Sequence, residues 1–106
     1  MNFMINGDKW HISETTTEHL LELLDPEDKS TYVFGLTSRS QHQIYLNNMM
    51  CEDQKKKTLL HELMHCYLWE YGINAESFHE ENVCDIFASA YSVAKPIYEK
   101  YFKEGK

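Results

Sequence analysis

The sequence predicts an α+β fold, in which a small antiparallel β-sheet of hairpins packs on two helices. Short alternating apolar runs bounded by turn residues fill the first half of the chain, and two long helical patterns follow in the second half. The 106 residues suit one domain, so we expect a single domain over residues 1–106. A hydrophobic fraction of 42% with 13% aromatic residues indicates a folded core.

The N-terminus predicts a β-hairpin. The runs "MNFMI" and "DKWHIS" flank Asn6-Gly7, which is a strong signal for a two-residue turn. In that register Phe3 lies opposite Trp10, and one face of the hairpin is apolar. The residues expected on that face are Phe3, Ile5, Trp10 and Ile12.

A short helix and a second pair of strands are expected next. The run "TTTEHLLELLD" predicts a helix that is capped by Thr15 or Thr16 and stops before Pro26. The runs "TYVFGLT" and "HQIYLNN" predict strands joined by the polar turn "SRSQ".

Two helices complete the predicted fold. The first should run from about Glu52 to Tyr71 and end at Gly72, with acidic residues in its first turn where the helix dipole favours them. The second should begin near Glu76 or Ser77, and Pro96 should end or kink it because proline removes a backbone donor.

Charge and composition exclude several classes of function. Lysine and arginine total 10 against 17 acidic residues, giving a net charge of -7, which disfavours nucleic acid and anionic membranes as partners. No apolar run is long enough to span a membrane, and the N-terminus lacks the order of a signal peptide. The three cysteines match no disulfide framework, so we expect reduced thiols in a cytoplasmic protein.

The run "HELMH" in the first long helix carries the chemistry. At about 100° per residue, His61 and His65 lie about 40° apart on the flank of the apolar face, and Glu62 lies beside them, further from the core. Two such histidines can bind zinc, while the adjacent glutamate polarises the metal-bound water. The residues predicted to form the core face of this helix are Leu60, Leu63, Met64, Tyr67 and Tyr71.

A catalytic zinc needs a third protein ligand, and the last helix offers one. Glu81 and Asp85 lie four residues apart on one flank of its apolar stripe. If the two stripes pack together, Glu81 becomes the third ligand and Asp85 accepts the outer N–H of a ligand histidine. The predicted stripe of this helix consists of Val83, Phe87, Ala90, Tyr91 and Ala94.

Competing sites fit less well. A metzincin would need a glycine and a third histidine where Leu68 and Tyr71 stand. On a helix His79 points about 160° away from Glu81, which favours a loop or surface role. Cys66 and Cys84 lack the electropositive setting of a reactive thiol and are expected to be buried.

The runs "HELMH" and "ENVCDIF" together resemble the gluzincin metallopeptidases, and most closely the small ImmA/IrrE-type members. The resemblance implies a minimal zincin-like fold with His61, His65 and Glu81 as zinc ligands. It also implies Glu62 as the general base and Asp85 as the carboxylate that supports a ligand histidine. Members of this family are cytosolic, and some cut a repressor protein. The family often has asparagine where Asp85 stands here.

The function expected from these observations is zinc-dependent hydrolysis of a peptide bond in an intracellular protein, such as a regulator. The substrate should add a strand along a sheet edge from "TYVFGLT" or "HQIYLNN". For the oxyanion, the tyrosines, His42 and His79 are equal candidates. The alternatives are a non-catalytic zinc-binding interaction module and a metal-free interaction protein, and the sequence specifies no oligomeric state.

Overall fold

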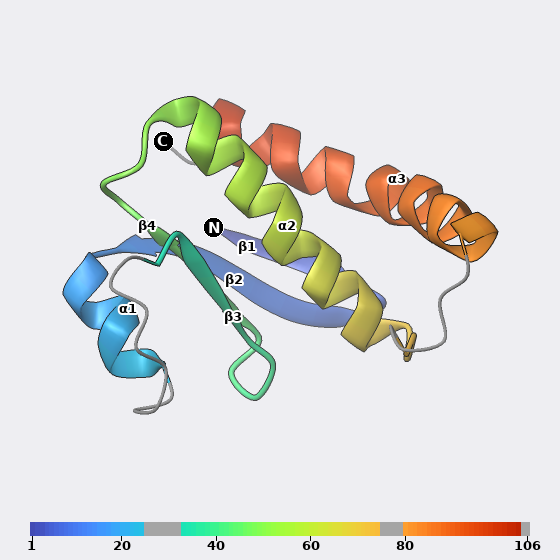
Figure 1. The fold of residues 1–106 in the computed structure, drawn as a ribbon, viewed down its shortest axis with the longest axis horizontal. Helices are drawn as coiled ribbons and strands as arrows, with labels where there is room; N and C mark the ends of the chain where they lie inside the picture. Colours follow the sequence, from blue (N-terminus) through green and yellow to red (C-terminus); the bar gives the residue numbers. More distant parts are fainter. Residues whose placement is uncertain (25–32, 75–79, 105–106) are drawn as a thin grey trace.

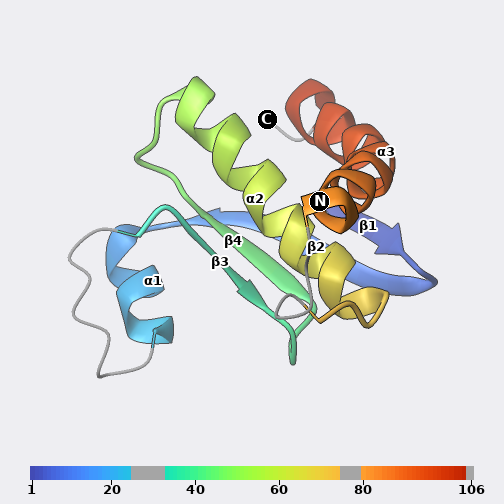
Figure 2. The ribbon, with the colours of Figure 1, turned by 45° about the vertical axis from the view of Figure 1, so that its right-hand side comes forward.

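The structure is a computed structural model that describes residues 1–24, 33–74 and 80–104, except for the side chains of 80–85 and 104. Within these ranges the sheet faces two long helices that lie side by side, while a short helix lies at one end (Figures 1 and 2). The strands are β1 (Asn2–Ile5), β2 (Asp8–Thr15), β3 (Gly35–Ser38) and β4 (Gln43–Asn47). The helices are α1 (Thr17–Leu23), α2 (Glu52–Glu70) and α3 (Glu80–Glu104).

The sheet has the strand order β1-β2-β4-β3, which confirms the α+β class. Two antiparallel hairpins form its halves, but β2 and β4 pair in parallel, so the expectation of a wholly antiparallel sheet is wrong. Turn residues specify each hairpin locally. The pairing between the two hairpins depends instead on the position at which the long connection through α1 places β3 and β4. As a result β4 is internal, and β1 and β3 are the edge strands.

The N-terminal hairpin is confirmed in its register. Phe3 pairs with Trp10, and the turn residues Asn6 and Gly7 have φ angles of 48° and 82°, as a type I′ turn requires. The four side chains predicted to share a face are all buried, namely Phe3, Ile5, Trp10 and Ile12.

Helix α1 is fastened to the sheet through Asn47. The Thr16 side chain caps α1 by accepting from the His19 N–H, as predicted. The fully buried Asn47 amide donates to Thr17 Oγ1 and to the Val33 carbonyl, each at 2.8 Å, and its Oδ1 accepts from the Met49 N–H. Strand β3 begins at Gly35. The strand predicted over residues 31–37 is therefore too long at its start, since the described residues 33 and 34 are not in a strand.

Helix α2 ends as predicted, but its buried face is different. Gly72 has a φ of 65°, and the Ile73 N–H bonds to the Leu68 carbonyl, which closes the helix. Tyr71 is 45% exposed, so its expected place in the core is wrong. Because α2 contacts both the sheet and α3, its buried arc is broader than a single stripe (Figure 2). The buried residues are Thr58, Leu59, Glu62, Leu63 and Cys66.

Helix α3 runs through Pro96 to Glu104, so Pro96 does not end the last helix, and the alternative that it kinks the helix stays a prediction. Proline has no N–H, so the Ser92 carbonyl loses the hydrogen bond that it would accept in a regular helix. Ser92 and Pro96 are both exposed, and water can solvate that carbonyl. The start predicted near residues 76–77 lies outside the described residues.

Helix α3 packs through its small residues. Ala90 and Ala94 are buried, as predicted, whereas Phe87 and Tyr91 are 58% and 44% exposed, which corrects their expected place in the core. The Val83 side chain lies outside the described residues. The Tyr101 hydroxyl donates to Glu14 of β2, and Glu14 also pairs with Lys55 of α2, so this carboxylate links both helices to the sheet. None of the described helices is long and apolar enough to cross a membrane.

Candidate metal centre

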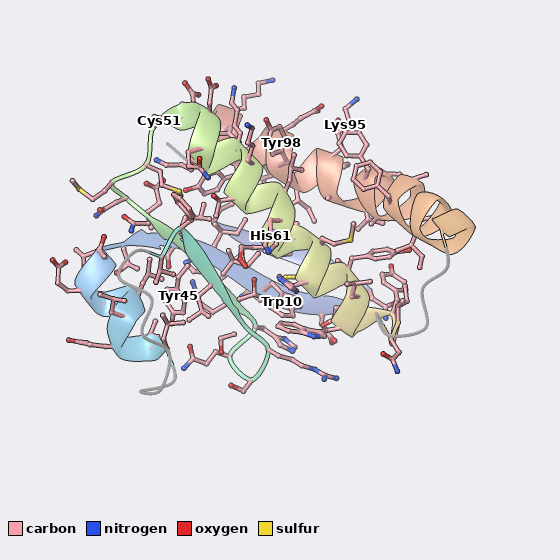
Figure 3. All side chains as sticks on the ribbon, viewed as in Figure 1. Trp10, Tyr45, Cys51, His61, Lys95 and Tyr98 are labelled. Atoms are coloured by element: carbon pink, nitrogen blue, oxygen red, sulfur yellow. The ribbon has the colours of Figure 1, made fainter. Side chains whose placement is uncertain are left out.

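The two histidines of "HELMH" converge midway along α2, where Figure 3 labels His61. Their Nε2 atoms lie 3.2 Å apart, and one ligand atom from each of His61, Glu62 and His65 lies within 4.8 Å of the others. Two zinc–nitrogen bonds of about 2.05 Å at a tetrahedral angle place the nitrogens about 3.3 Å apart. The observed separation therefore fits two imidazoles that share one metal ion.

Packing prepares His65 for this role. Its ring stacks on Trp69 with centroids 5.7 Å apart and meets the His61 ring edge-on at 4.9 Å. Burial, and then the charge of His61, lower the pKa of His65 below its ordinary value. The neutral imidazole, which is the form that binds metal, is therefore favoured at neutral pH.

Glu62 lies against the sheet and is only 5% exposed, so the expectation that it projects away from the core is wrong. A Cβ atom at Gly35 would lie 3.5 Å from Glu62 Cγ, which shows how closely β3 approaches this side chain. Burial raises the pKa of the Glu62 carboxyl, while the charge of His61 and a hydrogen bond from Thr37 act in the opposite direction. The site thus holds a carboxylate in a poorly solvated place beside an edge strand.

The third ligand predicted from the sequence is on α3. Glu81 and Asp85 belong to the first turns of α3, but their side chains lie outside the described residues, as do His79 and the Cys84 side chain. The assignments of Glu81 and Asp85 stay predictions. Cys66 is fully buried, as expected, and burial raises the pKa of its thiol well above the usual range.

An apolar groove lies between α2 and α3. Two of its lining residues, Leu60 and Met64, are one residue before and three residues after His61 on the same helix, so the groove begins within a turn of the histidines. The remaining lining residues are Phe87, Ala90, Tyr91 and Ala94. The two exposed aromatic side chains of α3 therefore form a wall of this groove.

Sequence reasoning missed the sheet residues that support the site. Gly35 and Thr37 of β3 contact Glu62, and the sequence placed both in the candidate edge strand "TYVFGLT" without connecting them to Glu62. His42, one of the oxyanion candidates, stacks on Trp10 with centroids 4.6 Å apart and lies close to Asp8 and Glu70. No motif in the sequence connects those residues.

Comparison with known proteins agrees with the motifs. The model of a peptidase family described as the IrrE N-terminal-like domain matches residues 18–104. No curated protein and no solved structure matches the chain. The family match covers most of the chain, including "HELMH" and the "ENVCDIF" run, and it confirms the resemblance found from the sequence. The chain therefore belongs to the IrrE N-terminal-like family of peptidases.

Proposed function

We propose that this protein is a zinc-dependent peptidase that hydrolyses a peptide bond in a cytoplasmic protein or peptide. The observation that carries the proposal is the 3.2 Å separation of the His61 and His65 Nε2 atoms, with the Glu62 carboxyl group beside them. Membership of a peptidase family supports the same chemistry.

In this proposal His61, His65 and Glu81 hold the metal. Two imidazoles and one carboxylate suit zinc, and three protein ligands leave a position open for water and substrate. When bound there, zinc lowers the pKa of water and polarises the substrate carbonyl. Asp85, one turn after Glu81, accepts the outer N–H of a ligand histidine and keeps that ring in its metal-binding tautomer.

Glu62 is the general base of the proposed reaction. Its carboxylate takes a proton from the attacking water and then delivers that proton to the leaving amine nitrogen. The buried setting, which raises the pKa of Glu62, suits a group that must both accept and return a proton.

The substrate is proposed to bind as an extended strand along β3. Of the two strands considered from the sequence, β4 is internal, whereas β3 is an edge and contacts Glu62 through Gly35 and Thr37. A strand added there gains backbone hydrogen bonds next to the histidines.

The decisive experiment compares three zinc-loaded proteins on a library of quenched fluorescent peptides. We expect wild type to cleave a subset of the peptides, Glu62→Gln to keep one zinc per chain without turnover, and the exposed control Glu22→Gln to behave as wild type. Cleavage by zinc-loaded Glu62→Gln would remove Glu62 as the base. No cleavage of any peptide or denatured protein by zinc-loaded wild type would contradict the peptidase proposal.

A non-catalytic zinc-binding module is the second candidate, and the position of β3 at the edge of the described sheet favours it. In that case a protein partner pairs with β3 and stays intact. A partner complex of equal affinity for wild type and Glu62→Gln, with no cleavage of the partner, would favour this function over the first.

A further inference from the structure

A second group of metal-binding side chains lies away from the HELMH histidines. It brings together Asp8 at the start of β2, His42 in the turn before β4 and Glu70 at the end of α2. One ligand atom from each of the three lies within 4.8 Å of the others. Figure 3 shows Trp10, which contacts both His42 and Glu70, beside the C-terminal half of α2, whereas His61 is at the middle of that helix.

The orientation of the His42 ring is fixed by its neighbours. Its Nδ1 lies 3.2 Å from the Lys9 carbonyl oxygen, and its plane is within 8° of the Trp10 ring. A carbonyl oxygen only accepts hydrogen bonds, so Nδ1 must carry a proton. In the neutral ring the lone pair is then on Nε2, which faces Glu70 Oε1 at 4.0 Å. A backbone carbonyl bound to the other ring nitrogen is the usual support of a metal-binding histidine.

Glu70 is held just as firmly. Its side chain is only 7% exposed, and Trp10 Nε1 donates to its Oε1 at 3.0 Å. Within the described parts of the chain no lysine or arginine pairs with this carboxylate. Asp8 brings a second negative charge to the same place. An imidazole and two carboxylates therefore converge, and within the described residues no lysine or arginine is paired with Glu70.

We propose that Asp8, His42 and Glu70 form a second site for a divalent transition-metal ion. One nitrogen and two carboxylate ligands suit zinc, cobalt, nickel or manganese. At ordinary bond lengths a tetrahedral ion holds its ligands about 3.4 Å apart, so His42 and Glu70 need to approach by a few tenths of an ångström. Glu70 is five residues after His65 in α2, so this site is separate from the HELMH histidines.

The role of this site is structural. Its three ligands come from the N-terminal hairpin, the β3–β4 turn and the end of α2, and the Asn6 side chain already donates to the Glu70 carbonyl at 2.8 Å. A bound ion would cross-link these three segments and fix the end of α2 against the hairpin.

Two tryptophans allow the two sites to be read separately. Trp10 stacks on His42, whereas Trp69 stacks on His65, and these are the only tryptophans in the sequence. In Trp69→Tyr the tryptophan fluorescence comes from Trp10 alone, and a bound cobalt ion quenches a tryptophan that it lies against. Cobalt titration of Trp69→Tyr is therefore the test, with binding stoichiometry by equilibrium dialysis beside it.

We expect saturable quenching of Trp10, weakened at least about tenfold by Glu70→Gln or His42→Asn and unchanged by His65→Ala. Glu70→Gln keeps the acceptor for Trp10, and asparagine tolerates the left-handed backbone of His42, whose φ is 52°. In equilibrium dialysis, the variants His65→Ala and Glu70→Gln should each bind one cobalt ion per chain fewer than wild type. If cobalt at millimolar concentration leaves Trp10 fluorescence unchanged, or if Glu70→Gln binds as many ions as wild type, the site does not exist. The three side chains then meet without a metal ion.

Discussion

Replacing Gly35 with alanine tests how closely β3 must approach α2. The added Cβ would lie 2.9 Å from Thr58 Cγ2 and 3.1 Å from the Tyr45 carbonyl oxygen. Non-bonded carbon atoms prefer a separation of about 3.5–4.0 Å, so the methyl contact is short by at least about 0.6 Å. Gly35 does not have a positive φ, so the cost is steric rather than conformational.

Overpacking of this kind destabilises a well-packed core by about 1–3 kcal/mol. Thr58→Ser removes the methyl group that clashes and keeps the hydroxyl, at a cost of about 0.8 kcal/mol for the buried carbon. We therefore expect Gly35→Ala to lower the free energy of unfolding by about 2 kcal/mol, and Thr58→Ser to recover about half of that loss in the double variant. The contact with Tyr45 prevents full recovery.

Urea unfolding of wild type, both single variants and the double variant measures this coupling. Gly7→Ala is the matched control, because Gly7 has open space around it but a φ of 82°. Its loss of about 1–2 kcal/mol comes from backbone strain and should not respond to Thr58→Ser. If Gly35→Ala unfolds within about 0.5 kcal/mol of wild type, the close approach of β3 to α2 is not as described.

Three further predictions concern buried polar groups. Burial raises the pKa of Glu62, so the contribution of this carboxyl to stability falls as pH rises above the unfolded value of 4.5 and becomes constant above the folded pKa. The stability of metal-free Glu62→Gln relative to wild type should therefore increase as pH rises from below 4.5, and a difference that stays constant from about pH 4 to pH 8 would contradict the assignment. Asn47→Ala removes three hydrogen bonds at a fully buried position and should cost about 3 kcal/mol in urea unfolding, against less than about 1 kcal/mol for a surface asparagine. Tyr101→Phe removes the hydroxyl that bonds Glu14 and should cost about 1.5–3 kcal/mol by thermal unfolding, and an unchanged melting temperature would show that Lys55 alone satisfies the carboxylate.

The parts of the fold that the sequence predicted are specified by neighbouring residues. The Asn6-Gly7 turn determines a hairpin register, and Gly72 ends α2, because both depend on φ angles that few residues adopt. The parallel pairing of β2 with β4 escaped prediction because it joins residues such as His11 and Gln43, which no local pattern connects. Pro96 does not end α3, because an exposed helix face tolerates a missing hydrogen bond.

The candidate site was likewise predictable only where neighbouring residues specify it. The spacing of His61 and His65 on one helix fixes their convergence, so a local pattern was sufficient. The burial of Glu62 was missed because it depends on β3, which only the fold brings to that side of α2. The grouping of Asp8, His42 and Glu70 likewise depends on three separate segments.

The parallel pairing of β2 with β4 also has a consequence for folding kinetics. Each hairpin closes through residues near one another in the chain, whereas Thr15 and Asn47, which pair across β2 and β4, are separated by the whole of α1 and β3. Loop-closure entropy makes such long-range pairing slow compared with hairpin formation. Because β3 reaches Glu62 only when this pairing is complete, we expect the candidate metal centre to be assembled late, after both hairpins have formed.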